Sequence, residues 1–146
     1  MAQLEPAPEN SNEARRHAEG LVRAFIQSDR QARLLALIAT PKGRHKLGSA
    51  LAHLRILDAA IARPLPGSLS DPKKIIGILR AAGAPGTCYV ISESREMDGK
   101  FLPLEKVIDN VVGGGVGTLV SCIPGELGFF EGEGPSDRYI LRRSQR

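Results

Sequence analysis

The spacing of apolar residues changes about halfway along the chain, and this change limits the fold more than any other feature of the sequence. From Ala14 to Leu79, apolar residues recur mainly every three or four positions, which is the period of a helix with one buried face. From Thr87 onward, short runs rich in β-branched and aromatic residues are bounded by glycine and proline, which is typical of strands. The sequence therefore predicts a helical first part and a sheet-forming second part.

Local signals indicate where the helices begin and end. Thr40-Pro41 and Asp71-Pro72 each pair an N-cap residue with a proline at the first helical position, where the missing N–H costs nothing. Ser28 or Asp29 is a further candidate N-cap. Pro64 and Pro66 predict an extended connector. Helices are accordingly expected over 11–26, 28–39, 41–54 and 70–83, with another from Pro103 to Val112.

The remaining apolar runs predict a sheet. Strands are expected over 87–92, 118–123, 126–131 and 138–143, with a brief pairing at 100–102. The predicted class is α+β: an N-terminal cluster of three to four helices packs on one face of a mostly antiparallel sheet of four to five strands with one inserted helix. Residues 1–10 are expected to be a disordered lead-in, and residues 11–146 a single domain with a helical part (11–69) and a sheet part (70–146).

The apolar runs and the cysteines of the sequence indicate the compartment in which the chain is expected. No basic stretch followed by an apolar stretch marks a secretion signal at the start, and no apolar run reaches the roughly eighteen residues that would span a bilayer. Cys88 and Cys122 both lie inside apolar runs, where a free cysteine behaves as a small hydrophobic residue. We expect a cytoplasmic protein with no membrane partner, no metal and no cofactor.

Charge is unevenly distributed, and it offers the best sequence argument for an acidic partner. Residues 1–83 carry an excess of Lys and Arg, whereas residues 84–137 carry an excess of Asp and Glu. Cations gather on the third predicted helix, which could neutralise the phosphates of a nucleic acid or the carboxylates of a protein. A solvated helix face, or one that complements the acidic loops, is the alternative. The candidate binding residues are Lys42, Arg44, His45, Lys46 and Arg55.

Two features suggest enzyme chemistry, but each has a simpler structural explanation. Cys122 lies at a strand end, yet all three histidines lie in the helical part, so nothing supports a base beside it. Two acidic loops could converge on a hard metal ion, but their spacing matches no known loop template. Turn chemistry explains them equally well. The loops contain Glu93, Glu96 and Asp98, and Glu131, Glu133 and Asp137.

The glycine run at 113–117 does not have the order of a phosphate-binding loop. Such a loop leaves a strand and enters a helix, so that N–H groups face the phosphate. Here the run leaves a predicted helix and enters a strand. It therefore reads as a helix end that needs glycine conformations.

The last predicted hairpin suggests a docking surface. Phe129 and Phe130 are adjacent and must point to opposite faces of a strand, so one of them could be exposed beside Tyr139. If the last strand also forms the sheet edge, the hairpin could dock a partner or a second copy by strand addition. On balance the sequence favours a non-enzymatic binding protein with a protein partner or a homodimer. Nucleic-acid binding and a small enzyme using Cys122 or the acidic loops remain the alternatives.

Overall fold

A computed structural model provides the structure, and it describes residues 12–51, 56–132, 134 and 137–143. The expected lead-in at 1–10 and the candidate Arg55 lie outside these residues. The helices are α1 (Asn12–Phe25), α2 (Ser28–Ile38), α3 (Pro41–Ala50), the short 3₁₀ helix η2 (Gly67–Leu69), α4 (Pro72–Ala81) and α5 (Leu104–Val111). The strands are β1 (Ala62–Pro64), β2 (Thr87–Ser92), β3 (Phe101–Pro103), β4 (Thr118–Ile123), β5 (Leu127–Glu131) and β6 (Arg138–Arg142).

The strands form one sheet in the order β1-β6-β5-β4-β2-β3, and every neighbouring pair is antiparallel. The predicted α+β class with N-terminal helices and an antiparallel sheet is confirmed. The sheet has six strands, one more than the upper limit expected. The additional strand is β1, in the segment that was expected to be only a connector.

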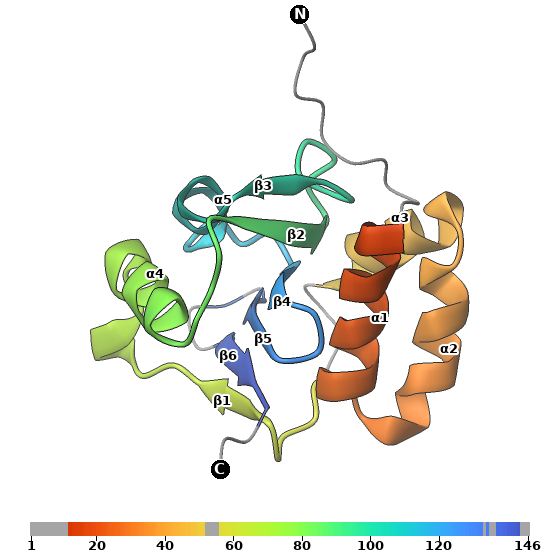
Figure 1. The fold of residues 1–146 in the computed structure, drawn as a ribbon, viewed down its shortest axis with the longest axis horizontal. Coiled ribbons are helices and arrows are strands. Elements are labelled where there is room, and N and C mark those ends of the chain that lie inside the picture. Colours follow the sequence, from red (N-terminus) through yellow and green to blue (C-terminus); the bar gives the residue numbers. More distant parts are fainter. Residues whose placement is uncertain (1–11, 52–55, 133, 135–136, 144–146) are drawn as a thin grey trace, which may run out of the picture.

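Helices cover both faces of the sheet, so the expectation of one covered face is wrong (Figure 1). The helices α1, α2 and α3 pack on one face, against a core that includes Tyr89, Ile91 and Phe130. The helices α4 and α5 pack on the other face, against a core that includes Val90 and Phe129. Adjacent residues of the central strands are therefore buried on opposite sides. The unbroken apolar run Cys88–Ile91 of β2 follows from this arrangement.

The two expected cap-and-proline steps are confirmed. The Thr40 hydroxyl accepts a hydrogen bond from the Gly43 N–H at 3.0 Å, and the Asp71 carboxylate accepts one from the Lys74 N–H at 3.0 Å. The cap expected for the second helix is wrong, because Ser28 is already helical and the residue before it, Gln27, makes no side-chain cap. The first cap matters for the site, because it fixes where α3 begins.

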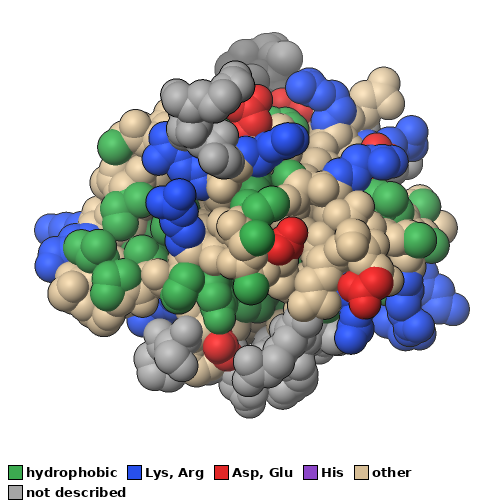
Figure 2. Space-filling model, turned by 90° about the horizontal axis from the view of Figure 1, so that it is seen from below, with side chains coloured by type: hydrophobic (Ala, Val, Ile, Leu, Met, Phe, Trp, Pro, Cys, Tyr) green, Lys and Arg blue, Asp and Glu red, His purple; other side chains and the backbone are tan. Residues whose placement is uncertain are grey.

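The surface of the described residues carries little concentrated apolar area. Among them, Leu69 is the one large hydrophobic residue that is exposed. On the face seen in Figure 2, Lys and Arg side chains are interspersed with hydrophobic ones, and acidic side chains are scattered. None of the described helices has the length and apolar character needed to cross a membrane. This surface therefore offers hollows, rather than a flat apolar face, as candidate binding sites.

Candidate functional site

A hollow of about 270 Å³ lies where the start of α3 meets the turn after β2. The α3 side supplies Arg44 and His45, and the turn supplies Arg95 and Asp98. Pro41 completes the lining. Two arginines and a histidine thus surround one acidic residue, and the hollow carries an excess of positive charge.

The base of this hollow is a buried ion pair. The Arg44 Nε lies 4.0 Å from the Asp98 Oδ2, and both side chains are less than one-tenth exposed. The Asp98 Oδ1 also accepts a hydrogen bond of 3.0 Å from the Ser92 N–H. Burial raises the pKa of Asp98, whereas the Ser92 N–H and the Arg44 charge oppose that rise. Asp98 therefore ties the turn to both β2 and α3, and holds Arg44 in place.

A close approach of two backbones brings α3 to the sheet. A Cβ atom added at Gly48 would lie 2.6 Å from the carbonyl oxygen of Ser92, so only glycine fits this crossing. Ser92 ends β2 and also donates to Asp98. Gly48 therefore sets the depth at which Arg44 enters the hollow.

The rim of the hollow is formed by His45 and Arg95. The Arg95 Nη2 lies 3.2 Å from the His45 Nε2, and this contact is exposed. A guanidinium can only donate hydrogen bonds, so in this contact the Arg95 Nη2 donates and the His45 Nε2 accepts. An entering anion could take over the Arg95 donors. A carboxylate or a phosphate is therefore the kind of group that fits this hollow.

A second hollow of about 260 Å³ adjoins the first, because Pro41 and Arg44 line both. Its walls come from α1 and α2 and are largely apolar, and its floor contains Tyr89 from β2. Two small residues of α1, one helical turn apart, leave room above that floor. The wall residues include Ala14, Ala18, Leu35, Ile38 and Ala39, with Arg15 and Glu19 as the charged members.

Tyr89 is a largely buried side chain that contributes to the lining of this second hollow. The residue is 1 % exposed, and its ring packs against Phe101 and His17. Within the part of the chain that the structure describes, its hydroxyl makes no hydrogen bond. Burial raises the pKa of Tyr89, so the hydroxyl stays protonated and can donate.

The predicted cations of the third helix do not share one surface. Lys42 and Lys46 are exposed, His45 is half-buried, and Arg44 is buried at 4 % exposure. The structure instead combines Arg44 and His45 with Arg95, which sequence reasoning missed. Arg95 is the single cation within the acidic stretch 93–98, and this placement is the feature of the sequence that could have identified it as a site residue. Nothing in the sequence marked Tyr89 as more than a strand residue.

The docking hairpin expected from the Phe pair is not exposed. Phe129 and Phe130 point to opposite faces as predicted, but they are 0 % and 4 % exposed. Tyr139 is half-buried and packs against Phe130. The last strand, β6, lies between β1 and β5, so the condition under which the hairpin could add a strand, that β6 forms the sheet edge, is not met.

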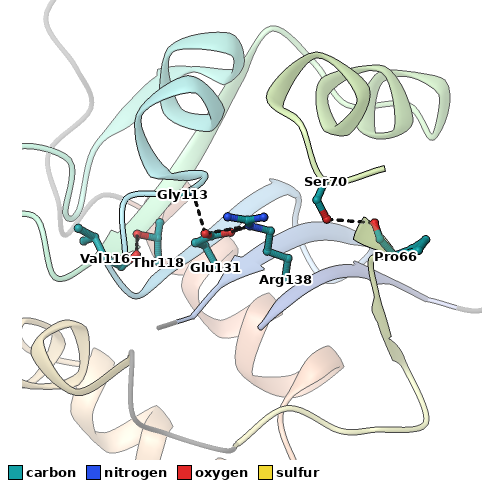
Figure 3. Close-up of polar contacts among 7 residues, drawn as sticks. All are labelled: Pro66, Ser70, Gly113, Val116, Thr118, Glu131 and Arg138. Atoms are coloured by element: carbon teal, nitrogen blue, oxygen red, sulfur yellow. Dashed lines mark hydrogen bonds and ion pairs between the residues drawn. The ribbon is translucent and has the colours of Figure 1, made fainter. Parts of the chain in front are cut away.

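Two carboxylates of the acidic loops, those of Glu131 and Glu93, accept hydrogen bonds from the backbone. The single N–H at the Arg138 Nε is shared between the two carboxylate oxygens of Glu131, at 2.8 and 3.0 Å, and the carboxylate also accepts a hydrogen bond of 3.0 Å from the Gly113 N–H (Figure 3). The Glu93 carboxylate accepts a hydrogen bond of 2.8 Å from the Gly117 N–H. Both ends of the glycine run are thus fastened to the sheet. Within the described residues, no group of three or more His, Cys, Asp or Glu side chains could hold a metal ion.

Cys122 lies in the core between the sheet and the helices α4 and α5, at 2 % exposure. Burial raises the pKa of the Cys122 thiol to about 12, so the reactive thiolate is scarce at neutral pH. The neighbouring Ser121 faces α1 instead, where its hydroxyl bonds His17. These facts favour a packing role for Cys122.

No family model matches the chain, and comparisons with curated proteins and with solved structures found no match. The interpretation of the site therefore rests on its geometry and its chemistry.

Proposed function

We propose that this chain is a non-enzymatic binding protein that receives a carboxylate of a protein partner in the hollow lined by Arg44, His45 and Arg95. The observation that carries the proposal is the meeting of two arginines and a histidine, from two segments distant in the sequence, around one hollow. The one acidic residue there already accepts a hydrogen bond from Ser92 and faces Arg44.

The burial of Arg44 supports binding rather than general attraction of anions. A guanidinium held below the surface by Asp98 keeps one orientation, and its electrostatic attraction for an anion is screened less by water and salt than that of an exposed lysine. Arg95 at the rim can pair with a carboxylate through two parallel hydrogen bonds. The hollow therefore combines one buried cation of fixed orientation with one donor group at the rim that can adjust.

A titration followed by NMR tests the proposal. The ¹⁵N-labelled chain is titrated with an N-acetylated glycine peptide that carries one glutamate, and in parallel with the same peptide carrying glutamine. We expect saturable shifts at the amides of Arg44, His45 and Arg95 with the glutamate peptide alone. Shifts of equal size with both peptides would contradict the proposal.

A matched pair of variants locates the effect. Arg95→Gln removes a rim cation and should weaken binding of the glutamate peptide at least threefold. Arg63→Gln removes an exposed cation from β1, outside the residues that line the hollow, and should leave binding unchanged. Equal weakening by both variants would mean that net charge alone attracts the peptide.

Nucleic-acid binding is the second candidate, and the exposed side chains of Lys42 and Lys46 are the observation that favours it. They lie four positions apart on α3 and could contact neighbouring phosphates. A nucleic-acid protein would bind a short DNA duplex with an affinity that falls steeply with salt. It would lose that affinity when both lysines are replaced by glutamine, and not when Arg95 alone is replaced.

A further inference from the structure

The second hollow has the composition of a binding pocket. Its walls are mainly apolar, and two buried side chains with hydrogen-bond donors, Tyr89 and Arg44, meet at its base. Apolar walls with a few placed polar groups are the usual pattern of a ligand site. The Tyr89 side chain lines the hollow, and its hydroxyl can donate a hydrogen bond to a group that enters there.

We infer that this hollow receives a hydrophobic side chain of the protein partner. In the partner's sequence, this residue is adjacent to the acidic residue bound in the first hollow. The Tyr89 hydroxyl donates a hydrogen bond to the backbone carbonyl between the two residues. The inference rests on the proposed function and adds the partner's recognition motif: one acidic residue next to one large apolar residue.

The shared lining residues make one continuous segment the natural occupant. Pro41 and Arg44 line both hollows, so groups bound in the two lie close together. Neighbouring side chains of an extended peptide point in different directions, so one can enter each hollow while the backbone crosses between them. The backbone of such a segment supplies the carbonyl that Tyr89 needs.

The size of the hollow also favours a peptide side chain. At about 260 Å³, it is smaller than the roughly 300–1,000 Å³ of sites that enclose a drug-sized ligand. The small side chains of Ala14 and Ala18 create the space, and the exposed Ala39 stands at its entrance. A bulky residue at position 39 would therefore fill the hollow from outside without disturbing the core.

The test compares two peptides that share the acidic residue. One is the N-acetylated glycine peptide with a single glutamate, and the other has leucine directly after the glutamate. Binding is measured by calorimetry and by NMR shifts. We expect the leucine peptide to bind at least tenfold more tightly, with new shifts at Ala18, Ile38 and Tyr89. A peptide with serine in place of leucine should behave like the glutamate peptide.

Three variants separate the parts of the inference. Ala39→Trp should abolish the tenfold gain while leaving binding of the glutamate peptide unchanged. Ala36→Trp places the same side chain at an exposed position of α2 that does not line the hollow, and should change neither peptide. Tyr89→Phe removes only the hydroxyl and should weaken the leucine peptide roughly threefold to tenfold, the loss typical of one hydrogen bond. Its thermal midpoint should match or exceed that of the parent chain.

The outcomes distinguish this inference from the proposed function. If the glutamate peptide binds at Arg95 but leucine adds nothing, the second hollow is not a recognition site and the proposed function stands. If neither peptide binds, both proposals fail. If octanoate binds more tightly than the leucine peptide and is displaced by Ala39→Trp, the ligand is a small amphipathic acid and the partner motif is wrong.

Discussion

The Nδ1 of His17 and the hydroxyl oxygen of Ser121 lie 2.7 Å apart between α1 and the centre of the sheet. Both side chains are buried, and the His17 ring also packs edge-on against Phe101. This pair joins the first helix to β4. It is a buried polar contact between the helical part and the sheet.

The His17 pair should make stability depend on pH. Burial lowers the pKa of the His17 imidazole, and the charge of Glu13 only partly opposes this effect. The unfolded chain therefore takes up the proton first. The contribution of neutral His17 is complete above the ordinary histidine pKa of about 6.5 and is lost as the pH falls below it. Urea unfolding between pH 8 and pH 5 should show this loss, and His17→Gln should show a smaller slope. Parallel slopes would contradict the assignment.

Ser121→Ala tests the same contact without a change of charge. The substitution leaves a buried imidazole nitrogen without its partner, which should cost about 1–3 kcal/mol in the free energy of unfolding. Ser94→Ala, at a half-buried position in the turn after β2, serves as a comparison with no lost partner for His17. Urea denaturation at pH 7.5 measures both. A cost for Ser121→Ala no larger than that for Ser94→Ala would show that the bond is dispensable.

The buried ion pair between Glu131 and Arg138 should contribute strongly to the stability of the fold. Their side chains are 2 % and 11 % exposed, and Glu131 also accepts the Gly113 N–H. Glu131→Ala leaves a buried arginine without its partner and should lower the free energy of unfolding by about 3–5 kcal/mol. The double change Glu131→Leu with Arg138→Met should recover part of that loss, because apolar packing replaces the pair. Thermal and urea unfolding measure both, and a double variant less stable than Glu131→Ala would contradict this account.

An exposed ion pair provides the contrast. The Arg80 Nη2 lies 2.8 Å from the Glu105 Oε2, linking α4 to α5, but both side chains are about half exposed. Water and salt screen such a pair, so Glu105→Ala should cost less than about 1 kcal/mol. The same urea measurement applies. A loss comparable to that of Glu131→Ala would mean that exposure does not govern these contacts.

The two cysteines should be unreactive in the folded chain. Both are buried, and burial raises the pKa of each thiol, that of Cys122 to about 12. An aromatic disulfide reagent at pH 7.5 should react only as fast as the chain unfolds, and should release two thiols per chain in denaturant. Rapid labelling of Cys122 in the native protein would instead favour the enzyme alternative.

The sequence predicted the parts of the fold that depend on neighbouring residues. Thr40-Pro41 and Asp71-Pro72 mark helix starts through local hydrogen bonds, and those starts are where they were expected. The strand β1 was missed because Ala62-Arg63-Pro64 is too short to show alternation. It exists only because Leu141, Ile140 and Tyr139 of β6 pair with it. The unbroken apolar run of β2 is the sequence signal that both faces of the sheet are covered, because a strand with one exposed face alternates apolar and polar residues.

The candidate site was only half visible in the sequence. Arg44 and His45 were selected for their charge, but which of them points inward depends on the packing of α3 against β2 at Gly48. Arg95 and Asp98 reach the same hollow through the fold of the turn, and no spacing rule relates them to α3. Tyr89 becomes notable only when the helices above it are in place. Local sequence patterns do not predict such long-range contacts.

The two outermost strands have a consequence for how other chains can approach. β1 and β3 have three residues each, and each ends in a proline, at Pro64 and Pro103. A foreign strand laid along either border would find few amide donors, since proline has none. Stacking of copies into a growing ribbon is therefore discouraged at both margins. Contact with another molecule at these two margins would instead rely on side chains.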